Sequence, residues 1–211
     1  MVEPPEFRYT LMLITDRHRS RLPLLELVRF AVDGGVNAVQ VREKDLVLDD
    51  LQSLAARIVE AVEGKAWVVV NGRLDVAKEL GIGVHLPESG PSVEEARAVL
   101  GDVAIIGRSV HSPEAATAVR SADYAIAGHV LPTKSKPRIK PLKMEKFKAI
   151  TKVVSCPVFA IGGITAGSIR SMMKSGALGV AVIGAIAEAD DPRAAAQELR
   201  TALDEWSNDG G

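Results

Sequence analysis

The chain lacks the features that mark secreted, membrane-spanning or nucleic-acid-binding proteins. It has a single cysteine, Cys156, so it cannot form an internal disulfide, and we expect this residue to pack in the core. No apolar run reaches the roughly 18 residues that suggest a membrane span. The 26 basic and 27 acidic residues give a formal net charge of -1, which argues against nucleic acid or an anionic membrane as a partner.

Residues 1–10 also lack the basic, apolar and small-residue order of a signal peptide. No low-complexity tract or linker interrupts the remainder. With 211 residues, of which 47% are hydrophobic and 25% charged, the chain is long enough for one well-packed domain. We therefore expect a soluble, cytoplasmic protein with a single domain over residues 1–211.

Short apolar runs rich in valine and isoleucine alternate with longer segments of helical periodicity. Continuous hydrophobicity is typical of parallel strands that helices cover. Eight runs meet this description: 9–15, 38–42, 66–71, 83–86, 103–108, 123–128, 157–162 and 178–184. Eight such alternations in a chain of this length predict an α/β fold, a single-domain (β/α)8 barrel of the TIM type.

In such barrels the functional site lies at the carboxyl ends of the strands, and here nearly every end is polar or glycine-rich. Gly162 and Gly163 follow the seventh run, and Ile183 and Gly184 end the eighth. Backbone N–H groups free of side chains at helix starts favour a phosphate group, although such glycines also serve tight turns. We expect a phosphate to bind at these four residues.

Cationic and neutral polar side chains follow the second, third and fifth runs. Arg42 and Lys44 alternate along an extended segment, so both can face one carboxylate or phosphate; the alternative is a solvated cluster with the neighbouring acidic residues. Asn71 and Ser109 can hydrogen-bond a ligand, while Asn71 could instead only turn the chain. These four residues are candidate substrate contacts.

Histidines also stand at several strand ends. His129 follows the sixth run, and the hydroxyl and ammonium groups of Thr133, Lys134, Ser135 and Lys136 come next. A group that titrates near neutrality beside an anion site suits proton transfer, so His129 is a candidate general acid/base, with a structural role equally open. For His85 and His111 we favour structural or supporting roles.

Metal-binding patterns are missing as well. No spacing of histidines and carboxylates indicates zinc, and no strand end carries the acidic pair expected for Mg²⁺ at a phosphate. We predict no metal and no other cofactor.

Seven segments resemble, in order, the thiamine phosphate synthase and TenI superfamily over about residues 9–186: VREKD, VVVNGRLD, GVHLP, IIGRSVHS, ADYAIAGHV, PVFAIGGIT and GVAVIGAI. In the synthases, aspartates after the third and fourth strands hold the Mg²⁺ that bridges the pyrimidine pyrophosphate. Gly72 and Gly90 occupy these positions here, and GHVLPT stands where synthases usually read GPVFPT. The resemblance therefore favours the TenI branch, whose enzymes are thiazole tautomerases.

The resemblance to TenI implies a cofactor-independent isomerase of thiamin biosynthesis that aromatises a carboxylated thiazole phosphate. It implies that His129 is the general acid/base. Arg42 and Lys44, or the loop that carries Thr133, Ser135 and Lys136, would face the carboxylate. We expect this small molecule as the partner, without nucleic acid or membrane, and a homodimer stays open.

Two alternatives remain. The segment PTKSK resembles the PTxTK loop of the synthases, and Glu88 could replace one acidic metal ligand. The chain would then be a thiamine phosphate synthase, which joins thiazole phosphate and hydroxymethylpyrimidine pyrophosphate. The second alternative is a regulator that binds thiazole phosphate without catalysis; the lack of a helix-turn-helix pattern argues against direct DNA contact.

Overall fold

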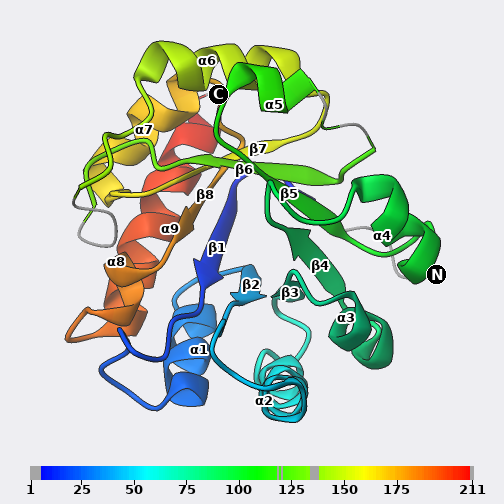
Figure 1. The fold of residues 1–211 in the computed structure, drawn as a ribbon. Helices are drawn as coiled ribbons and strands as arrows, with labels where there is room; N and C mark the ends of the chain where they lie inside the picture. The colour runs from blue at the N-terminus through cyan, green and yellow to red at the C-terminus, as the bar shows by residue number, and fades with distance from the viewer. Residues whose placement is uncertain (1–5, 118, 120, 134–137, 210–211) are drawn as a thin grey trace.

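Eight parallel strands close into one barrel in chain order, as the sequence predicts. The computed structural model describes residues 6–117, 119, 121–133 and 138–209. The strands are β1 (Thr10–Ile14), β2 (Ala38–Val41), β3 (Trp67–Asn71), β4 (Gly83–Leu86), β5 (Ile106–Val110), β6 (Tyr124–Gly128), β7 (Val158–Ile161) and β8 (Gly179–Val182). Hydrogen bonds between β8 and β1 close the ring. Because all strands are parallel, their carboxyl ends share one rim (Figure 1).

Helices surround the barrel on its outside (Figure 1). They are α1 (Leu24–Asp33), α2 (Leu48–Ala61), α3 (Leu74–Leu80), α4 (Val93–Leu100), α5 (Pro113–Thr117), α6 (Met144–Val153), α7 (Ala166–Lys174), α8 (Gly184–Ala187) and α9 (Pro192–Asn208). The last strand is thus followed by a short helix and a long one. Within the part of the chain that the structure describes, none of the helices combines the length and apolarity needed to cross a membrane.

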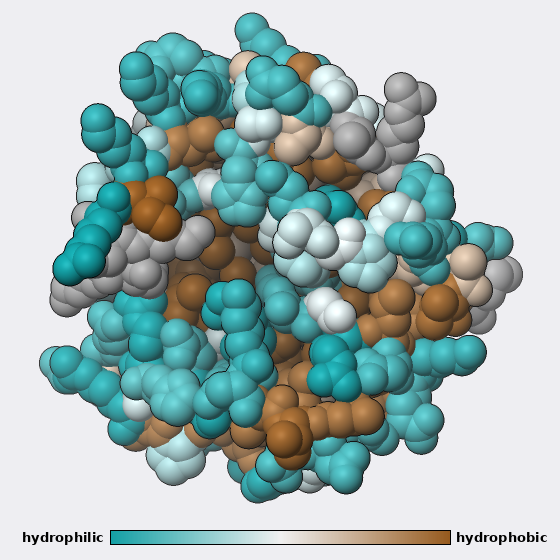
Figure 2. Space-filling view, viewed as in Figure 1, coloured by the Kyte–Doolittle hydropathy of each residue, from teal (hydrophilic) through white to brown (hydrophobic). Residues whose placement is uncertain are grey.

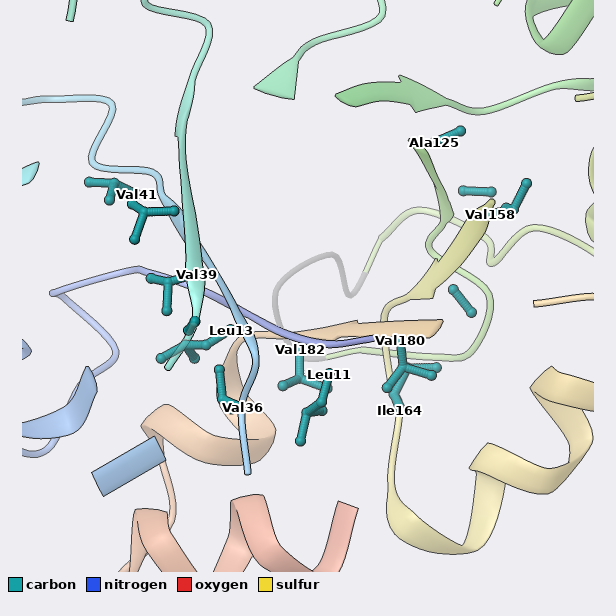
Figure 3. Close-up of a cluster of buried hydrophobic side chains, with 14 of the residues drawn as sticks. Leu11, Leu13, Val36, Val39, Val41, Ala125, Val158, Ile164, Val180 and Val182 are labelled. Carbon is teal, nitrogen blue, oxygen red and sulfur yellow. The ribbon is translucent and has the colours of Figure 1, made fainter. Parts of the chain in front are cut away.

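Alternate strand residues face two separate cores, because successive side chains of a strand point to opposite sides. Leu11, Leu13, Val180 and Val182 belong to the larger cluster between strands and helices. Leu11 pairs with Val180 and Leu13 with Val182 in the register of β1 and β8, and Figure 3 shows these side chains near one another. The smaller cluster fills the barrel itself, with Met12 among its members.

Aromatic rings occupy the amino-terminal half of the barrel interior. Tyr124 stacks on Phe159 with ring centroids 5.0 Å apart and meets Trp67 edge-on at 5.4 Å. Gly107 leaves room for the tyrosine, since a Cβ atom there would lie 2.1 Å from its Cζ. Because these rings fill the amino-terminal half of the barrel, the inward-facing polar side chains lie at the carboxyl ends of the strands.

The fifth strand begins three residues later than its apolar run predicts. Val103 is 91% exposed, whereas the backbone N–H of Ile106 donates to Asp123 Oδ2 at 2.6 Å. Arg97 bonds the same carboxylate and the carbonyl of Ala104, which fixes the turn before the strand. Ser109 therefore lies inside β5 and faces the barrel interior, rather than following the strand.

Candidate active site

Gln40 and Asn71 lie side by side on the inner face of the barrel near its carboxyl rim. Gln40 Nε2 donates a hydrogen bond to Asn71 Oδ1 at 3.0 Å. Gln40 is only 2% exposed, and its Oε1 has no hydrogen-bond partner among the described residues. A buried acceptor without a partner is costly, so this oxygen suits a donor N–H on a ligand.

His85 forms a second polar group on the inner face. Its Nε2 lies 2.8 Å from Ser109 Oγ and its Nδ1 lies 3.1 Å from the Tyr124 hydroxyl. Burial first, and then the charges of Arg108 and Arg42, lower the pKa of His85 to about 3. The imidazole is therefore neutral at physiological pH, and it orients Ser109 rather than carrying charge.

Arg42 and Lys44 bring positive charge to the rim beyond β2. The Arg42 backbone N–H donates to Thr15 Oγ1 at 2.9 Å. Neither side chain forms a hydrogen bond or ion pair with any residue that the structure describes. A half-buried guanidinium without an acidic partner is well suited to an anionic ligand.

A cavity of about 350 Å³ lies outside the ends of β2, β3 and β4. Its lining includes Glu43, Lys44, Asn71, Gly72, Arg73 and Pro87. Arg73 binds the carboxylate of Asp75 through Nε and Nη2 at 3.0 and 2.8 Å. The cavity thus connects the neutral Asn71 with two cations, and it is large enough for a phosphorylated small molecule. Figure 2 shows hydrophilic residues over most of one molecular face, with hydrophobic residues lining the hollows between them.

The loops after β1 and β2 are joined by a charged network. Glu43, which is 5% exposed, accepts hydrogen bonds from the Arg17 backbone N–H at 3.1 and 3.2 Å and from its Nη1 at 3.1 Å. The same guanidinium binds both oxygens of Asp45 at 2.7 and 2.5 Å, which lowers the pKa of that carboxyl. Lys44 lies between these two anchored carboxylates, so its backbone position is fixed.

The two predicted phosphate loops are neighbours, because β7 pairs with β8. Gly162 and Gly163 have φ values of +96° and +69°, which side chains rarely adopt. A Cβ atom on Gly162 would lie 2.2 Å from His129 Cβ, and one on Gly163 would lie 2.5 Å from the Pro132 carbonyl oxygen. These glycines therefore allow close packing of the loop after β7 against the loop after β6, in addition to any ligand contact.

The loop after β1 brings Arg19, a cation that the sequence did not single out, against the loop after β8. Ile183 precedes α8, which begins at Gly184. A Cβ atom on Gly184 would lie 2.4 Å from Arg19 Nη2. Arg19 donates to Glu188 Oε1 from Nε at 2.7 Å and from Nη2 at 2.5 Å. The charge of Arg19 is thus shared between this carboxylate and the proposed phosphate position.

His129 lies at the end of β6 and is 7% exposed. Its Nε2 donates to the Ile139 carbonyl oxygen at 3.1 Å, and its own carbonyl accepts from the Leu142 backbone N–H at 2.7 Å. The ring therefore secures the segment that leads into α6. Thr133 is half-buried nearby in sequence, whereas Lys134, Ser135 and Lys136 lie outside the described residues.

The Mg²⁺ site implied by the resemblance to synthases does not fit the residues present. Gly72 and Gly90 cannot supply a side-chain ligand. Glu88, the acid after β4 that could replace one aspartate, accepts hydrogen bonds from the His111 backbone N–H at 2.6 Å and from its Nδ1 at 3.0 Å. No group of three His, Cys, Asp or Glu residues suited to a metal occurs among the residues that the structure describes.

Comparisons with known proteins match almost the whole chain to one family. The family model described as thiamine monophosphate synthase matches residues 11–186. A thiamine-phosphate synthase of Haloarcula marismortui is 40% identical over 85% of this chain and 89% of its own, and one of Chlorobium limicola is 39% identical over 90% and 91%. The structure of a thiamine phosphate pyrophosphorylase from Pyrococcus furiosus is 35% identical, with a TM-score of 0.84 over 93% of this chain and 96% of that one.

These names correct the expected activity. The sequence motifs favoured a thiazole tautomerase, an isomerase, whereas the similar proteins are named thiamine-phosphate synthase and, for the solved structure, thiamine phosphate pyrophosphorylase. The tautomerase assignment is therefore wrong, and the role of His129 as its proton carrier falls with it. The motifs gave the wrong branch because Gly72 and Gly90 were taken to exclude a synthase. The rest of the chain nevertheless matches the synthases.

Proposed function

The chain belongs to the thiamine monophosphate synthase family, and from this we propose that it joins thiazole phosphate to hydroxymethylpyrimidine pyrophosphate. Identity of 35–40% to proteins of that name across most of both chains carries the proposal. The ring nitrogen of the thiazole would displace diphosphate from the methylene carbon of the pyrimidine. A C–N bond forms while the C–O bond breaks, and the electron pair of the broken C–O bond leaves with the diphosphate.

The inner face of the barrel suits the pyrimidine ring. The unpaired Gln40 Oε1 can accept a hydrogen bond from an N–H on the ring edge, and Asn71 holds the Gln40 side chain in place. Ser109 Oγ, oriented by the neutral His85, offers another polar contact. Burial of these groups makes each hydrogen bond selective, because a ligand without the matching group leaves them unpaired.

The rim offers separate positions for the two anionic groups. Arg42 and Lys44 would hold the diphosphate and stabilise the charge that builds on it as it leaves. Gly162, Gly163, Ile183 and Gly184 would hold the phosphate of the thiazole at the loops after β7 and β8. Thr133, Ser135 and Lys136 remain candidate contacts to either anion from the loop after β6. Because Gly72 and Gly90 stand where the synthases have aspartates, this chain would hold no metal for the reaction through side chains at these two positions.

A two-substrate assay with purified protein tests the proposal. We expect thiamine phosphate and diphosphate to form in equal amounts only when both substrates are present. Gln40→Met keeps the volume but removes the acceptor, and should lower kcat/KM for the pyrimidine substrate by about 10- to 100-fold. KM for thiazole phosphate should stay near that of the parent protein, because the loops after β7 and β8 form its proposed site and Gln40 lies in β2.

Gln197→Met provides the matched control, because Gln197 is exposed on α9. It should behave as the parent protein. Absence of product with both substrates, despite tight binding of thiazole phosphate, would instead support a regulator that binds without catalysis.

A further inference from the structure

We propose that this chain binds the diphosphate group by direct contact with its own cations and supplies no ligand to a metal. The inference rests on the proposed function, since it concerns the diphosphate end of that site. It begins from the disagreement between the Mg²⁺ that the family resemblance implies and the residues found at the ends of β3 and β4.

Gly72 leaves open space in the cavity where a carboxylate would stand. Its φ is +68°, and a Cβ atom there would lie 3.6 Å from Pro87 Cδ, which is an ordinary contact. An aspartate would therefore fit, because this residue type tolerates the left-handed conformation better than most. Glycine is thus not required by crowding at this position. Its main effect is to remove a negative charge from the cavity.

The nearby acids are committed to other partners. Glu43 accepts from the backbone and side chain of Arg17, and Glu88 accepts from His111. The cations are more available. The side chains of Arg42 and Lys44 have no polar partner among the described residues, and that of Arg73 holds only the partly exposed Asp75. Such an exposed ion pair is weak, so Arg73 can exchange it for a ligand.

A site with two aspartates and Mg²⁺ carries the same net charge as a site with two glycines and no metal. Two aspartates and one Mg²⁺ sum to zero, so their joint replacement by two glycines leaves the net charge around a diphosphate unchanged. Arg42, Lys44 and Arg73 can then neutralise the diphosphate by direct hydrogen bonds. Loss of the aspartates alone, with the metal kept, would leave the metal without side-chain ligands at these positions.

Titration calorimetry with inorganic diphosphate tests this directly. The parent protein should bind diphosphate in the presence of EDTA. Added Mg²⁺ should weaken apparent binding, because it chelates the free diphosphate and finds no carboxylate pair on the protein. Binding that appears only with Mg²⁺ would overturn the inference.

Gly72→Asp returns one carboxylate to the cavity. In EDTA this variant should bind diphosphate at least about tenfold more weakly than the parent, because like charges now meet, and Mg²⁺ should recover part of the loss. Gly81→Asp is the matched control: Gly81 has a φ of +62°, no atom within 4 Å of its Cβ position, and a place before β4, at the other end of the barrel. It should bind as the parent does.

Lys44→Met provides a second variant in case Gly72→Asp does not fold, since Lys44 is exposed. It should lower the affinity for diphosphate in EDTA by about tenfold. Unchanged affinity in both folded variants would place the diphosphate elsewhere and end the inference. The proposed function fails separately: diphosphate binding without metal, but no product from the two substrates, would leave the inference standing and reject the synthase.

Discussion

His85 is enclosed by two hydroxyl groups, those of Tyr124 and Ser109. A neutral imidazole has one N–H donor and one acceptor nitrogen, and each hydroxyl can complement either. Protonation would turn both nitrogens into donors within a buried site, with Arg42 and Arg108 already adding positive charge. The folded state therefore excludes the proton that the unfolded chain accepts near pH 6.5.

This exclusion predicts a pH-dependent stability. Because the folded-state pKa of His85 is lowered to about 3, its contribution is complete above about pH 6.5 and is lost progressively as the pH falls toward 3. Between pH 7 and 4.5, the parent protein should lose roughly 2–3 kcal/mol more unfolding free energy than His85→Gln. Urea unfolding at both pH values measures the difference.

His18 supplies the control for that comparison, because 67% of its side chain is accessible and its contact with Asp45 is an exposed, and therefore weak, ion pair. His18→Gln should follow the parent protein at both pH values. An equal pH dependence for the parent and His85→Gln would show that the buried ring is protonated in the folded state.

Polar residues at the ends of the predicted apolar runs could be chosen as candidates from sequence, whereas residues inside those runs were overlooked. Arg42 and Asn71 were found because parallel strands place their carboxyl ends at one rim. Gln40 was missed because it lies inside the apolar run 38–42. The sequence did carry one signal for it, since Gln40 is a polar residue between two valines. Tyr124 was missed for the same reason. Their roles depend on which residues face them across the barrel, and one sequence does not contain that information.

At the scale of elements, the loops after β1 and β2 act as one unit. Glu43 and Asp45 both bind Arg17, and the residue between them is Lys44. Because the buried Glu43 is bonded to the backbone as well as to the guanidinium, the position of the loop after β2 depends on the loop after β1. This arrangement would hold the cations ready for the diphosphate and reduce the entropy lost on binding.

Glu43→Gln separates this positioning role from simple electrostatics. Removing a negative charge near Lys44 should by itself strengthen diphosphate binding. We expect the opposite, an affinity about three- to tenfold lower, because the amide presents N–H groups to the donors of Arg17 and releases the loop. Calorimetry with diphosphate measures the affinity. Asp49→Asn, an exposed site in the first turn of α2, removes the same charge without that contact and should not weaken binding.

The apolar runs located seven strands to within two residues at either end. The exception is β5, where Arg97 and Asp123 fix a turn that the hydrophobic pattern of Val103–Arg108 could not reveal. The division of the last helical region into α8 and α9 was also not predicted, since both are apolar on one side and only Asp191 and Pro192 mark the second start. Local hydrogen bonds, rather than hydrophobicity, decide these boundaries.

For the molecule as a whole, two kinds of sequence information disagreed. The fold was predicted from eight apolar runs and the family from seven ordered segments, and both predictions are confirmed. The branch was inferred from Gly72, Gly90 and the segment after β6, and this was wrong because a few positions can change while the rest of the chain stays close to the synthases. The oligomeric state remains a prediction.

Helix α9 covers the seam between β8 and β1, where it packs against α1, α7 and α8. Leu199 and Leu203 of this helix are buried. At Gly34, which ends α1, a Cβ atom would lie 2.4 Å from the Arg193 carbonyl oxygen and 2.7 Å from Ala196 Cβ. Helix α9 therefore approaches the end of α1 so closely that only the hydrogen atom of a glycine fits at position 34.

Two glycine-to-alanine changes should consequently shift stability in opposite directions. Gly34→Ala must push the backbone of α9 away from α1, and should lower the unfolding free energy by about 1–3 kcal/mol. Gly167→Ala lies in α7 with no atom within 4 Å of its Cβ position, and should raise the unfolding free energy by about 0.5–1 kcal/mol through helix propensity. Urea unfolding of both variants and the parent measures these values. If Gly34→Ala is as stable as the parent, α9 does not approach α1 this closely.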